Sequence, residues 1–314
     1  MSIIALDERS PPILLKSMFR SFLIALSVFV VVALVVLIPR DFTVSVTPQY
    51  WIVPDGSLNW QAYGENIRGY VHSAIEHRTL GVTRYGEPAE PVVWAAFKIS
   101  LPVILGALLA GFVLGIPKGM LDYALSRTRF ALLGGGTTWL MQALPDFFLL
   151  LLARWYVIHY QGSHIRFFAQ TGWESFVIPT VLASIYPIFY VARVTSSSIA
   201  GQEGLMYVKT ARAKGMPESI VFGRHIMSNS LARVFTHIMP LGVYILSSLL
   251  LIEYLRNVPG ASYRAFQAID YNKVTASGGN VEPGVLIGTA FCFMLLVLVF
   301  QAVGYLARRR VSAR

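Results

Sequence analysis

Residues 207–225 read YVKTARAKGMPESIVFGRH, a basic stretch with a glycine near its middle, and they lie between two apolar segments. The first part has good helix formers and contains no glycine or proline before Gly215. Gly215 suits the left-handed position that closes a helix, and Pro217 suits the first turn of the next helix, with Glu218 at its positive end. The stretch therefore predicts a short helix, a turn and a second helix that leads toward the apolar segment beginning at Val234.

The first of these predicted helices has two distinct faces. Val208, Ala211 and Gly215 share one face by their i, i+3, i+7 spacing, while Lys209 and Arg212 share another. Because Ala211 and Gly215 are small, we expect the first face to permit close approach of another backbone or of a bulky side chain. From these residues alone, a solvated cytoplasmic loop that only follows the positive-inside rule is the alternative.

The composition around this stretch is that of a polytopic membrane protein. Of the 314 residues, 55% are hydrophobic and 13% are charged, whereas a soluble globular domain carries about 25% charged residues. Six apolar segments are each near the roughly 20 residues that a helix needs to cross a bilayer, and helices are the open-chain structures that satisfy their backbone groups in lipid. The segments cover residues 22–38, 99–117, 131–153, 176–195, 234–252 and 284–306.

The distribution of Lys and Arg orients these six predicted spans. The net charge is +10, and with the N-terminus inside, 16 of the 26 Lys and Arg residues fall on the cytoplasmic side. The excess is therefore a topology signal and argues against nucleic-acid binding. Residues 1–21 and 307–314 are predicted to be cytoplasmic, in a multi-pass protein of the cell membrane in contact with membrane lipids. The segment 22–38 is expected to stay as an anchor, because Ile38-Pro39-Arg40-Asp41 offers no small-x-small cleavage site.

The remaining chain divides at the predicted spans. Residues 39–98 form an extracytoplasmic segment with a plausible amphipathic helix near residues 58–77. Residues 99–306 form a five-helix core that includes a cytoplasmic loop over residues 196–233. Small residues of the second span are expected to serve helix packing. They are Gly106, Gly111 and Gly115.

The sequence offers no catalytic, cofactor or metal motif of its own. It contains no Gly-Lys-Ser or Gly-Lys-Thr, and so no phosphate-binding loop for ATP. It contains no His-Glu-x-x-His pairing, and its one cysteine, Cys292, excludes an intrachain disulfide. We therefore expect neither an enzyme nor a resident cofactor, and a membrane enzyme is the weaker interpretation.

One acid lies inside a predicted span. Asp146 is near the middle of the third apolar segment, next to Pro145, which is expected to kink the helix. An ionisable residue at that depth is costly unless it faces a cavity or a partner. One interpretation is an acid that lines a translocation pathway with Gln142 and attracts cationic cargo. The other is a structural acid bonded to Gln142, Thr138 or another subunit, and both stay open.

The opening stretch resembles the cytoplasmic coupling motif of binding-protein-dependent ABC importer permeases, most closely that of their peptide/nickel branch. In that branch the pattern reads approximately Tyr-Val-x-x-Ala-Arg-Ala-x-Gly, followed by Arg-His-x-x-x-Asn. The matching residues are Tyr207, Val208, Ala211, Arg212, Ala213, Gly215, Arg224, His225 and Asn229. Lys209-Thr210 replaces the Glu-Ala pair that names the motif.

The resemblance extends over roughly residues 60–310. The stretch from Glu253 to Gly260 resembles the family's Glu…Pro-Gly sequence after the fifth span, and Asp270-Tyr271 resembles the Asp-Tyr that follows it. Residues 80–102 resemble the entry to the second span. The long outer segment is typical of the B-type subunit, which pairs with a C-type partner.

The resemblance implies an all-α permease with six transmembrane helices and a cytoplasmic coupling loop. It implies a second permease subunit, two cytoplasmic ABC ATPases that hold ATP and magnesium, and an extracytoplasmic solute-binding protein. The implied cargo is an oligopeptide or dipeptide; nickel or a metallophore is the alternative cargo, and a membrane assembly protein without transport is the alternative class. The implied coupling residues are Tyr207, Val208, Lys209, Ala211, Arg212, Ala213, Gly215, Pro217, Arg224 and His225.

Overall fold

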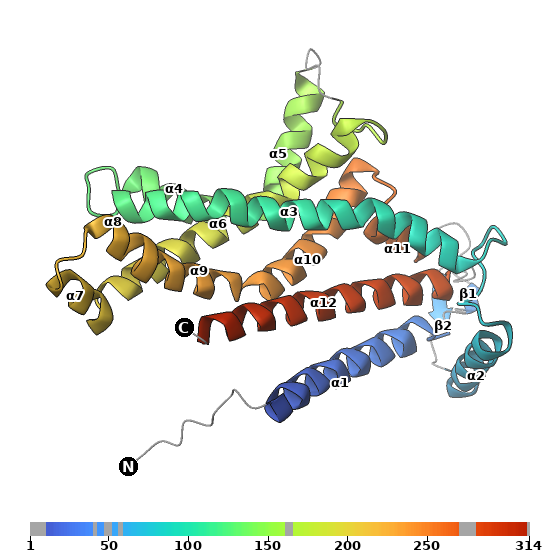
Figure 1. Cartoon of the computed structure of the whole chain (residues 1–314). Coiled ribbons are helices and arrows are strands. Elements are labelled where there is room, and N and C mark those ends of the chain that lie inside the picture. Colours follow the sequence, from blue (N-terminus) through green and yellow to red (C-terminus); the bar gives the residue numbers. More distant parts are fainter. Residues whose placement is uncertain are drawn as a thin grey trace. The chain divides into compact units, whose positions relative to one another are not determined.

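The computed structural model describes residues 11–39, 43–46, 52–55, 59–160, 166–269 and 281–312. The described chain is helical apart from one small hairpin, which confirms the predicted all-α class (Figure 1). It forms two compact units, one of residues 1–97 and 264–299 and the other of residues 98–263 and 300–314.

Within the described residues, five helices are long and apolar enough to cross a membrane, and a bent pair of helices makes a sixth if it is counted as one span. If the bent pair is counted as one span, the number of spans agrees with the six predicted segments. The five long helices are α1 (Pro11–Val36), α3 (Ala89–Leu125), α6 (Trp173–Glu203), α10 (Ile238–Arg256) and α12 (Pro283–Ser312).

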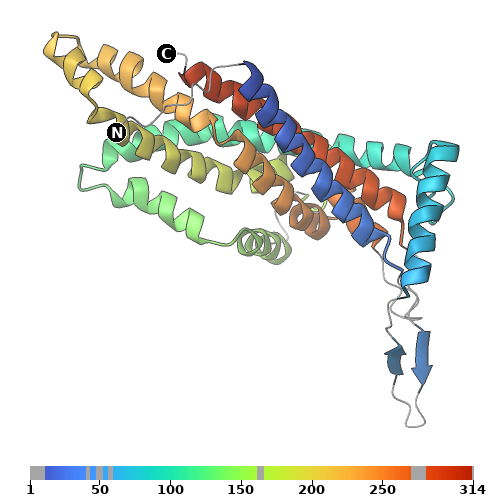
Figure 2. The same ribbon diagram turned by 90° about the horizontal axis from the view of Figure 1, so that it is seen from below.

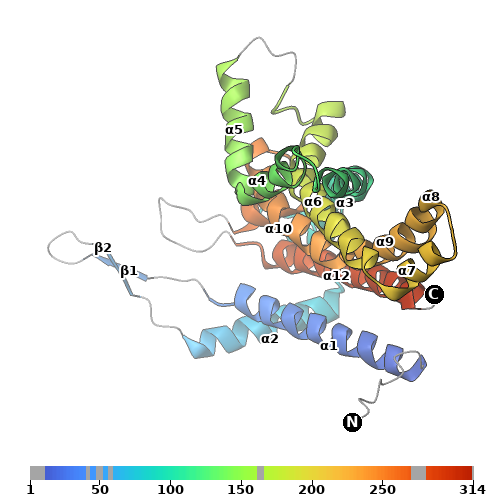
Figure 3. The same ribbon diagram turned by 90° about the vertical axis from the view of Figure 1, so that its left-hand side faces the viewer.

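The first unit contains α1 and most of α12, which run side by side in Figure 2. Phe29 of α1 meets Phe291 of α12 with ring centroids 5.8 Å apart. After α1 the chain forms strands β1 (Thr43–Val46) and β2 (Ile52–Asp55), which pair antiparallel (Figure 3). This hairpin was not among the sequence predictions.

The amphipathic helix predicted near residues 58–77 is α2 (Trp60–His77). Asn59 caps it, because its side-chain oxygen accepts hydrogen bonds from the backbone amides of Gln61 and Ala62. The helix ends at Arg78, which has a left-handed conformation with φ of 52°.

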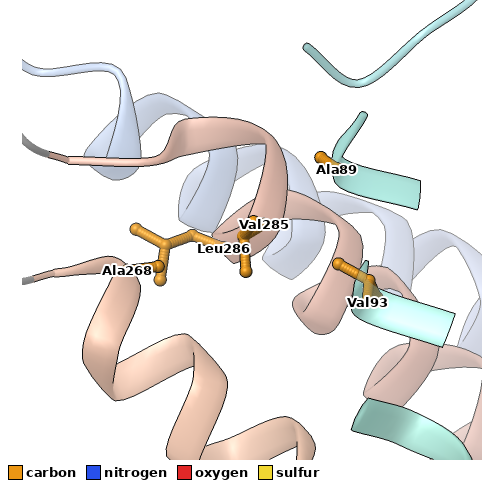
Figure 4. Close-up of a cluster of buried hydrophobic side chains, with 5 residues drawn as sticks. All are labelled: Ala89, Val93, Ala268, Val285 and Leu286. Atoms are coloured by element: carbon orange, nitrogen blue, oxygen red, sulfur yellow. The ribbon is translucent and has the colours of Figure 1, made fainter. Parts of the chain in front are cut away.

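A buried apolar cluster holds the first unit together (Figure 4). It joins the start of α3 to the C-terminal end of α11 (Ala261–Ala268) and the start of α12. Each contributing position is buried, so their packing holds the first turn of α12 against α3 and α11. The residues are Ala89, Val93, Ala268, Val285 and Leu286.

In the second unit, α3 packs closely on α6 through glycines, as the sequence predicted. A Cβ atom on Gly111 would lie 2.8 Å from the Cβ atom of Pro187, and one on Gly115 would lie 2.6 Å from the carbonyl oxygen of Ile188. Gly106 meets Thr180 in the same way. The row continues to Gly119, one turn beyond the predicted series.

The third predicted span, residues 131–153, is not a single straight helix. The chain forms a π-helical turn η1 (Leu132–Gly136), then α4 (Thr137–Ala143), and then α5 (Asp146–His159). The two halves meet at an angle of 91°, and Figure 1 shows α5 turning away from α4. Leu144 and Pro145 are extended, with ψ of 126° and 140°, so the kink expected at Pro145 is a complete break.

The segment after α6 contains the predicted helix–glycine–helix unit. It comprises α7 (Met206–Ala213), α8 (Glu218–Ile220), the π-helical turn η2 (Val221–Met227) and α9 (Ser228–Phe235). The chain then enters α10. The second predicted helix is therefore one helical run from Glu218 to Phe235 with a π-helical middle.

Candidate functional site

The turn of the predicted coupling unit has the geometry that its glycine requires. Gly215 has φ of +76°, the left-handed region, and its backbone N–H donates to the carbonyl oxygen of Arg212 at 2.9 Å. The N–H of Met216 reaches back to the carbonyl of Ala211 at 3.3 Å. Pro217 follows in an extended conformation and caps α8, one position earlier than the predicted first turn.

One face of α7 packs inside the subunit. The side chain of Val208 is fully buried and that of Ala211 is 5% exposed. Both join an apolar cluster with Ile199 of α6 and with Val221 and Ile226 of η2. Because this cluster packs both side chains inside the subunit, neither is exposed for a partner contact, and the close approach expected on this face is made by α6 and η2.

The exposed side of α7 is the opposite one. Met206, Lys209 and Ala213 share it by i, i+3, i+7 spacing, and the side chain of Met206 is 74% exposed. Three large apolar side chains close to α7 in the sequence are also exposed. They are Leu205, Met216 and Ile220, with basic Lys214 and Arg224 also exposed.

Three residues of the recognised motif meet in one polar cluster. Asn229 donates its side-chain amide to the carbonyl oxygen of His225 at 2.7 Å and to the hydroxyl of Tyr207 at 3.2 Å. The Tyr207 hydroxyl in turn donates to the side chain of Gln202, at the end of α6. These hydrogen bonds, called the polar clasp below, join α7 to η2 and α9. They explain the spacing of Tyr207, His225 and Asn229 in the motif.

Arg212 connects the two sides of the turn by charge. Its guanidinium donates to the carboxylate of Glu218 at 3.1 Å and 2.5 Å and lies 3.7 Å from that of Glu203. The hydrogen bond from Arg212 lowers the pKa of Glu218, and the same contact raises the pKa of Arg212. This pair keeps both groups charged at neutral pH.

Glu203 extends the charge network to α3. Its carboxylate accepts a hydrogen bond from the hydroxyl of Tyr123 at 2.6 Å and one from the guanidinium of Arg127 at 2.5 Å. The motif did not include these three residues. The opposite charges of Glu203 and Arg127 were the only signal in the sequence. That signal is weak, because Glu and Arg are common in the loops where these two residues lie.

Asp146 lies at the first turn of α5, at the break between the two halves of the third predicted span. The hydroxyl of Tyr244 in α10 donates a hydrogen bond to Asp146 Oδ2. The ring of Tyr186 in α6 stacks on that of Tyr244, with centroids 3.9 Å apart and an interplanar angle of 22°. These three side chains border one small cavity, which Ser248 and apolar residues complete.

Neither expected neighbour bonds to Asp146. Gln142 donates its amide to the carbonyl oxygen of Phe189 at 2.7 Å, which ties α4 to α6. Thr138 donates to Asp122 of α3 at 2.6 Å. Gln142 also does not border the cavity at Asp146, so the structure does not bring Gln142 and Asp146 together as a common site.

The Glu…Pro-Gly sequence after the fifth span forms a compact buried turn. Glu253 accepts hydrogen bonds from the hydroxyl of Ser100 and from the backbone N–H of Tyr263, the latter at 3.0 Å. A Cβ atom on Gly260 would collide with the Glu253 carboxylate, so this position requires glycine. Asp270-Tyr271 lies outside the described residues.

The described residues contain no group of three or more His, Cys, Asp or Glu side chains arranged to hold a metal ion. The arrangement at residues 199–229 instead offers a rigid, exposed helix with a basic and apolar surface. Such a surface can bind another protein.

A model of the family described as "Binding-protein-dependent transport system inner membrane component" matches residues 111–313. The dipeptide transport system permease protein DppB of Lactococcus lactis is 26% identical over 220 residues, which are 68% of this chain and 67% of that protein. DppB of Bacillus subtilis is 26% identical over 65% of this chain and 62% of its own length. The oligopeptide transport system permease protein OppB of Salmonella typhimurium is 26% identical over 54% of this chain and 56% of its own length.

A solved structure shares the fold. A crystal structure of an amino acid ABC transporter with histidines has a chain that matches 70% of this one, with 94% of that chain covered. The TM-score is 0.54 and the sequence identity is 17%.

Proposed function

Because this chain belongs to the family of binding-protein-dependent transport system inner membrane components, we propose that it is the permease subunit of an ATP-driven importer of dipeptides or oligopeptides. The family membership confirms the resemblance found in the Tyr207–Asn229 motif, and it makes the chain a multi-pass inner membrane protein that is not itself an enzyme. The peptide cargo rests on the relatives, whose matched parts cover 56–67% of their own lengths.

The observation that carries the proposal is the rigid helix–Gly215–helix unit inside the matched region. An apolar cluster, a polar clasp and a charge network each fix α7 to its own subunit. A helix held this firmly can transmit a push from a bound partner to α3 and α6 as a rigid body. The partners proposed are two cytoplasmic ABC ATPases that bind ATP and magnesium, a C-type second permease and an outer solute-binding protein.

The surface proposed for ATPase docking is the exposed side of α7, with Met206, Lys209 and Ala213. Apolar side chains supply contact area there, and basic groups orient the surface on an acidic partner. A cysteine at Met206 should therefore cross-link to a cysteine scan of the ATPase surface in the assembled complex. A cysteine at the buried Ala211 is the matched control, and equal cross-linking from both positions would refute this orientation of α7.

The identity of the cargo can be tested with the complex that co-purifies with this chain, after that complex has been reconstituted into vesicles. The proposal expects ATP-dependent uptake of dipeptides or oligopeptides delivered by the solute-binding protein. Uptake of nickel or a nickel chelate in place of peptides would establish the alternative cargo. A chain that co-purifies with neither ATPases nor a second permease, and supports no uptake, would instead be an assembly protein.

A further inference from the structure

The break between α4 and α5 places a carboxylate in an unusual environment. Leu144 and Pro145 interrupt the helix, and Asp146 begins α5 beside α6 and α10. Its side chain is half-buried and borders the small cavity with Tyr186 and Tyr244. An acid within a membrane-embedded helix pair is costly unless a partner compensates its charge.

The protein itself supplies only part of that compensation. Among the residues that the structure describes, Asp146 forms no ion pair, and its one side-chain partner is the neutral hydroxyl of Tyr244. By contrast, Asp122 of the same unit is paired with Lys118 and accepts from Thr138. Asp146 therefore keeps hydrogen-bond acceptor capacity at the edge of a cavity.

The groups around Asp146 suit an organic cation better than a metal ion. Tyr186 and Tyr244 provide aromatic rings, and aromatic rings attract cations through their faces. A hard metal cation such as calcium or magnesium would need several oxygen ligands, whereas the described residues form no cluster of three acidic, His or Cys side chains. One carboxylate, one hydroxyl and two rings instead suit an ammonium group, which has three donors and one charge.

We propose that Asp146, Tyr186 and Tyr244 form a subsite for a primary ammonium group of the transported molecule. The inference rests on the proposed peptide function and specifies which part of the cargo the permease attracts. The ammonium group would donate to the Asp146 carboxylate and lie against the tyrosine rings. Its source is either the free N-terminus of a peptide or a lysine side chain.

Uptake by the reconstituted complex separates these two sources. Alanyl-alanine carries only the terminal ammonium group, and alanyl-lysine carries a second one. Because a charge-assisted hydrogen bond is lost, Asp146→Asn should lower uptake roughly tenfold. Lower uptake of both peptides assigns the N-terminus, and lower uptake of alanyl-lysine alone assigns the side chain. Unchanged uptake of both would overturn the subsite.

Matched variants separate an ammonium subsite from a packing role. Tyr186→Phe keeps the ring and should transport normally, whereas Tyr186→Leu removes it and should reduce uptake. Asp146→Glu keeps the charge and should retain more uptake than Asp146→Asn. A packing role predicts a different pattern, in which Asp146→Asn and Tyr244→Phe equally lower the yield of assembled complex, and that pattern would also overturn the subsite.

A direct binding experiment needs no transport. Saturation-transfer NMR on the purified complex should detect alaninamide, a cation that mimics a peptide N-terminus, and the signal should fall in Asp146→Asn. N-acetylalaninamide is the neutral control and should give no signal that depends on Asp146. A wild-type complex that imports neither peptide would refute the proposed cargo, while equal alaninamide signals in wild type and Asp146→Asn would refute the ammonium subsite.

Discussion

Arg212 of α7 lies 3.7 Å from Glu203, the last residue of α6, and so joins the predicted coupling helix to a long apolar helix by charge. Glu203 also accepts hydrogen bonds from Tyr123, in the last turn of α3, and from Arg127, just after that helix. These contacts join α7 to both α6 and α3, and a displacement of α7 is expected to reach both helices through them. The apolar cluster around Val208 provides a second, independent connection between the same elements.

Gly215→Val is expected to uncouple ATP hydrolysis from transport. Gly215 has φ of +76°, and a β-branched residue there is strained by about 1–2 kcal/mol. A Cβ atom at this position would meet no atom within 4 Å, so the strain comes from the backbone alone. Substrate-stimulated ATPase activity and uptake are the measurements.

Gly215→Asn is the matched control, because asparagine tolerates the left-handed conformation better than valine. It should retain most of the coupling, and both variants should insert into the membrane normally. Intact uptake and normal ATPase stimulation in Gly215→Val would contradict a coupling role for this turn.

Gly115→Ala is expected to destabilise the subunit through the contact between α3 and α6. An added Cβ would lie 2.6 Å from the Ile188 carbonyl oxygen, and overpacking of this kind costs roughly 1–3 kcal/mol. The midpoint of thermal unfolding in detergent should fall. Gly135→Ala, where a Cβ meets nothing within 4 Å, should leave it nearly unchanged; equal shifts would refute the packing role.

The sequence was sufficient for features that depend on local residue type. The spans follow from the lengths of the apolar segments, and the left-handed turn follows from the glycine at position 215. The close contact between α3 and α6 follows from the spacing of the glycines around Gly111. Each of these features was predicted. The orientation of α7 was not, because two faces with small or basic side chains look equally able to bind a partner. The side chains that pack on Val208 and Ala211, among them Ile199 and Ile226, decide which face is inside.

The site at Asp146 shows a second limit of sequence. Pro145 predicted a kink, but a proline alone does not distinguish a bend from the break of 91° that the chain adopts. Tyr186 and Tyr244 are 58 residues apart in apolar segments, where tyrosine is an ordinary residue. Their relation to Asp146 arises from packing of α5, α6 and α10, which residue spacing does not encode.

Glu282 should make the first unit sensitive to acid. Burial raises the pKa of Glu282, but hydrogen bonds from Arg84, at 2.5 Å, and from Arg264 outweigh burial and leave the pKa below its usual value. Because the folded pKa is depressed, the stabilisation is present above the unfolded pKa of about 4.3 and is lost as pH falls through the folded pKa.

Thermal unfolding measured from pH 7 down to pH 3 tests this expectation. Glu282→Gln should be less stable at pH 7 and should lose less stability on acidification than the wild type. Glu87→Gln, at an exposed position of the same unit, is the control. Identical pH profiles for Glu282→Gln and the wild type would show that Glu282 does not stabilise the fold through its charge.

Both termini are expected to face the cytoplasm, since 16 of the 26 Lys and Arg residues fall on that side of the predicted topology. In a variant that lacks Cys292, cysteines replacing Ser2 or Ser312 should resist an impermeant maleimide in intact cells. A cysteine replacing the exposed Glu76 of α2 should react. Labelling at either terminus before the cells are opened would contradict this topology.

Glu203→Gln is expected to weaken transmission through the coupling unit without removing the docking surface. Glu203 receives its hydrogen bonds from Tyr123 and Arg127, and its charge attracts Arg212. A neutral amide keeps the size of the side chain but loses these charge-assisted contacts, each of which is worth about 1 kcal/mol or less when partly exposed. Global stability should therefore change little, because the apolar cluster at Val208 remains.

The measurement that separates docking from transmission is a comparison of co-purified ATPase with uptake per ATP hydrolysed. In Glu203→Gln the ATPases should co-purify in normal amount, while uptake per ATP falls several-fold. Arg129→Gln removes an exposed charge from the connection after α3, outside the proposed docking surface, and it serves as the control. Loss of ATPase co-purification in Glu203→Gln would place Glu203 in the docking surface, and normal uptake per ATP would show that the apolar cluster alone transmits the motion.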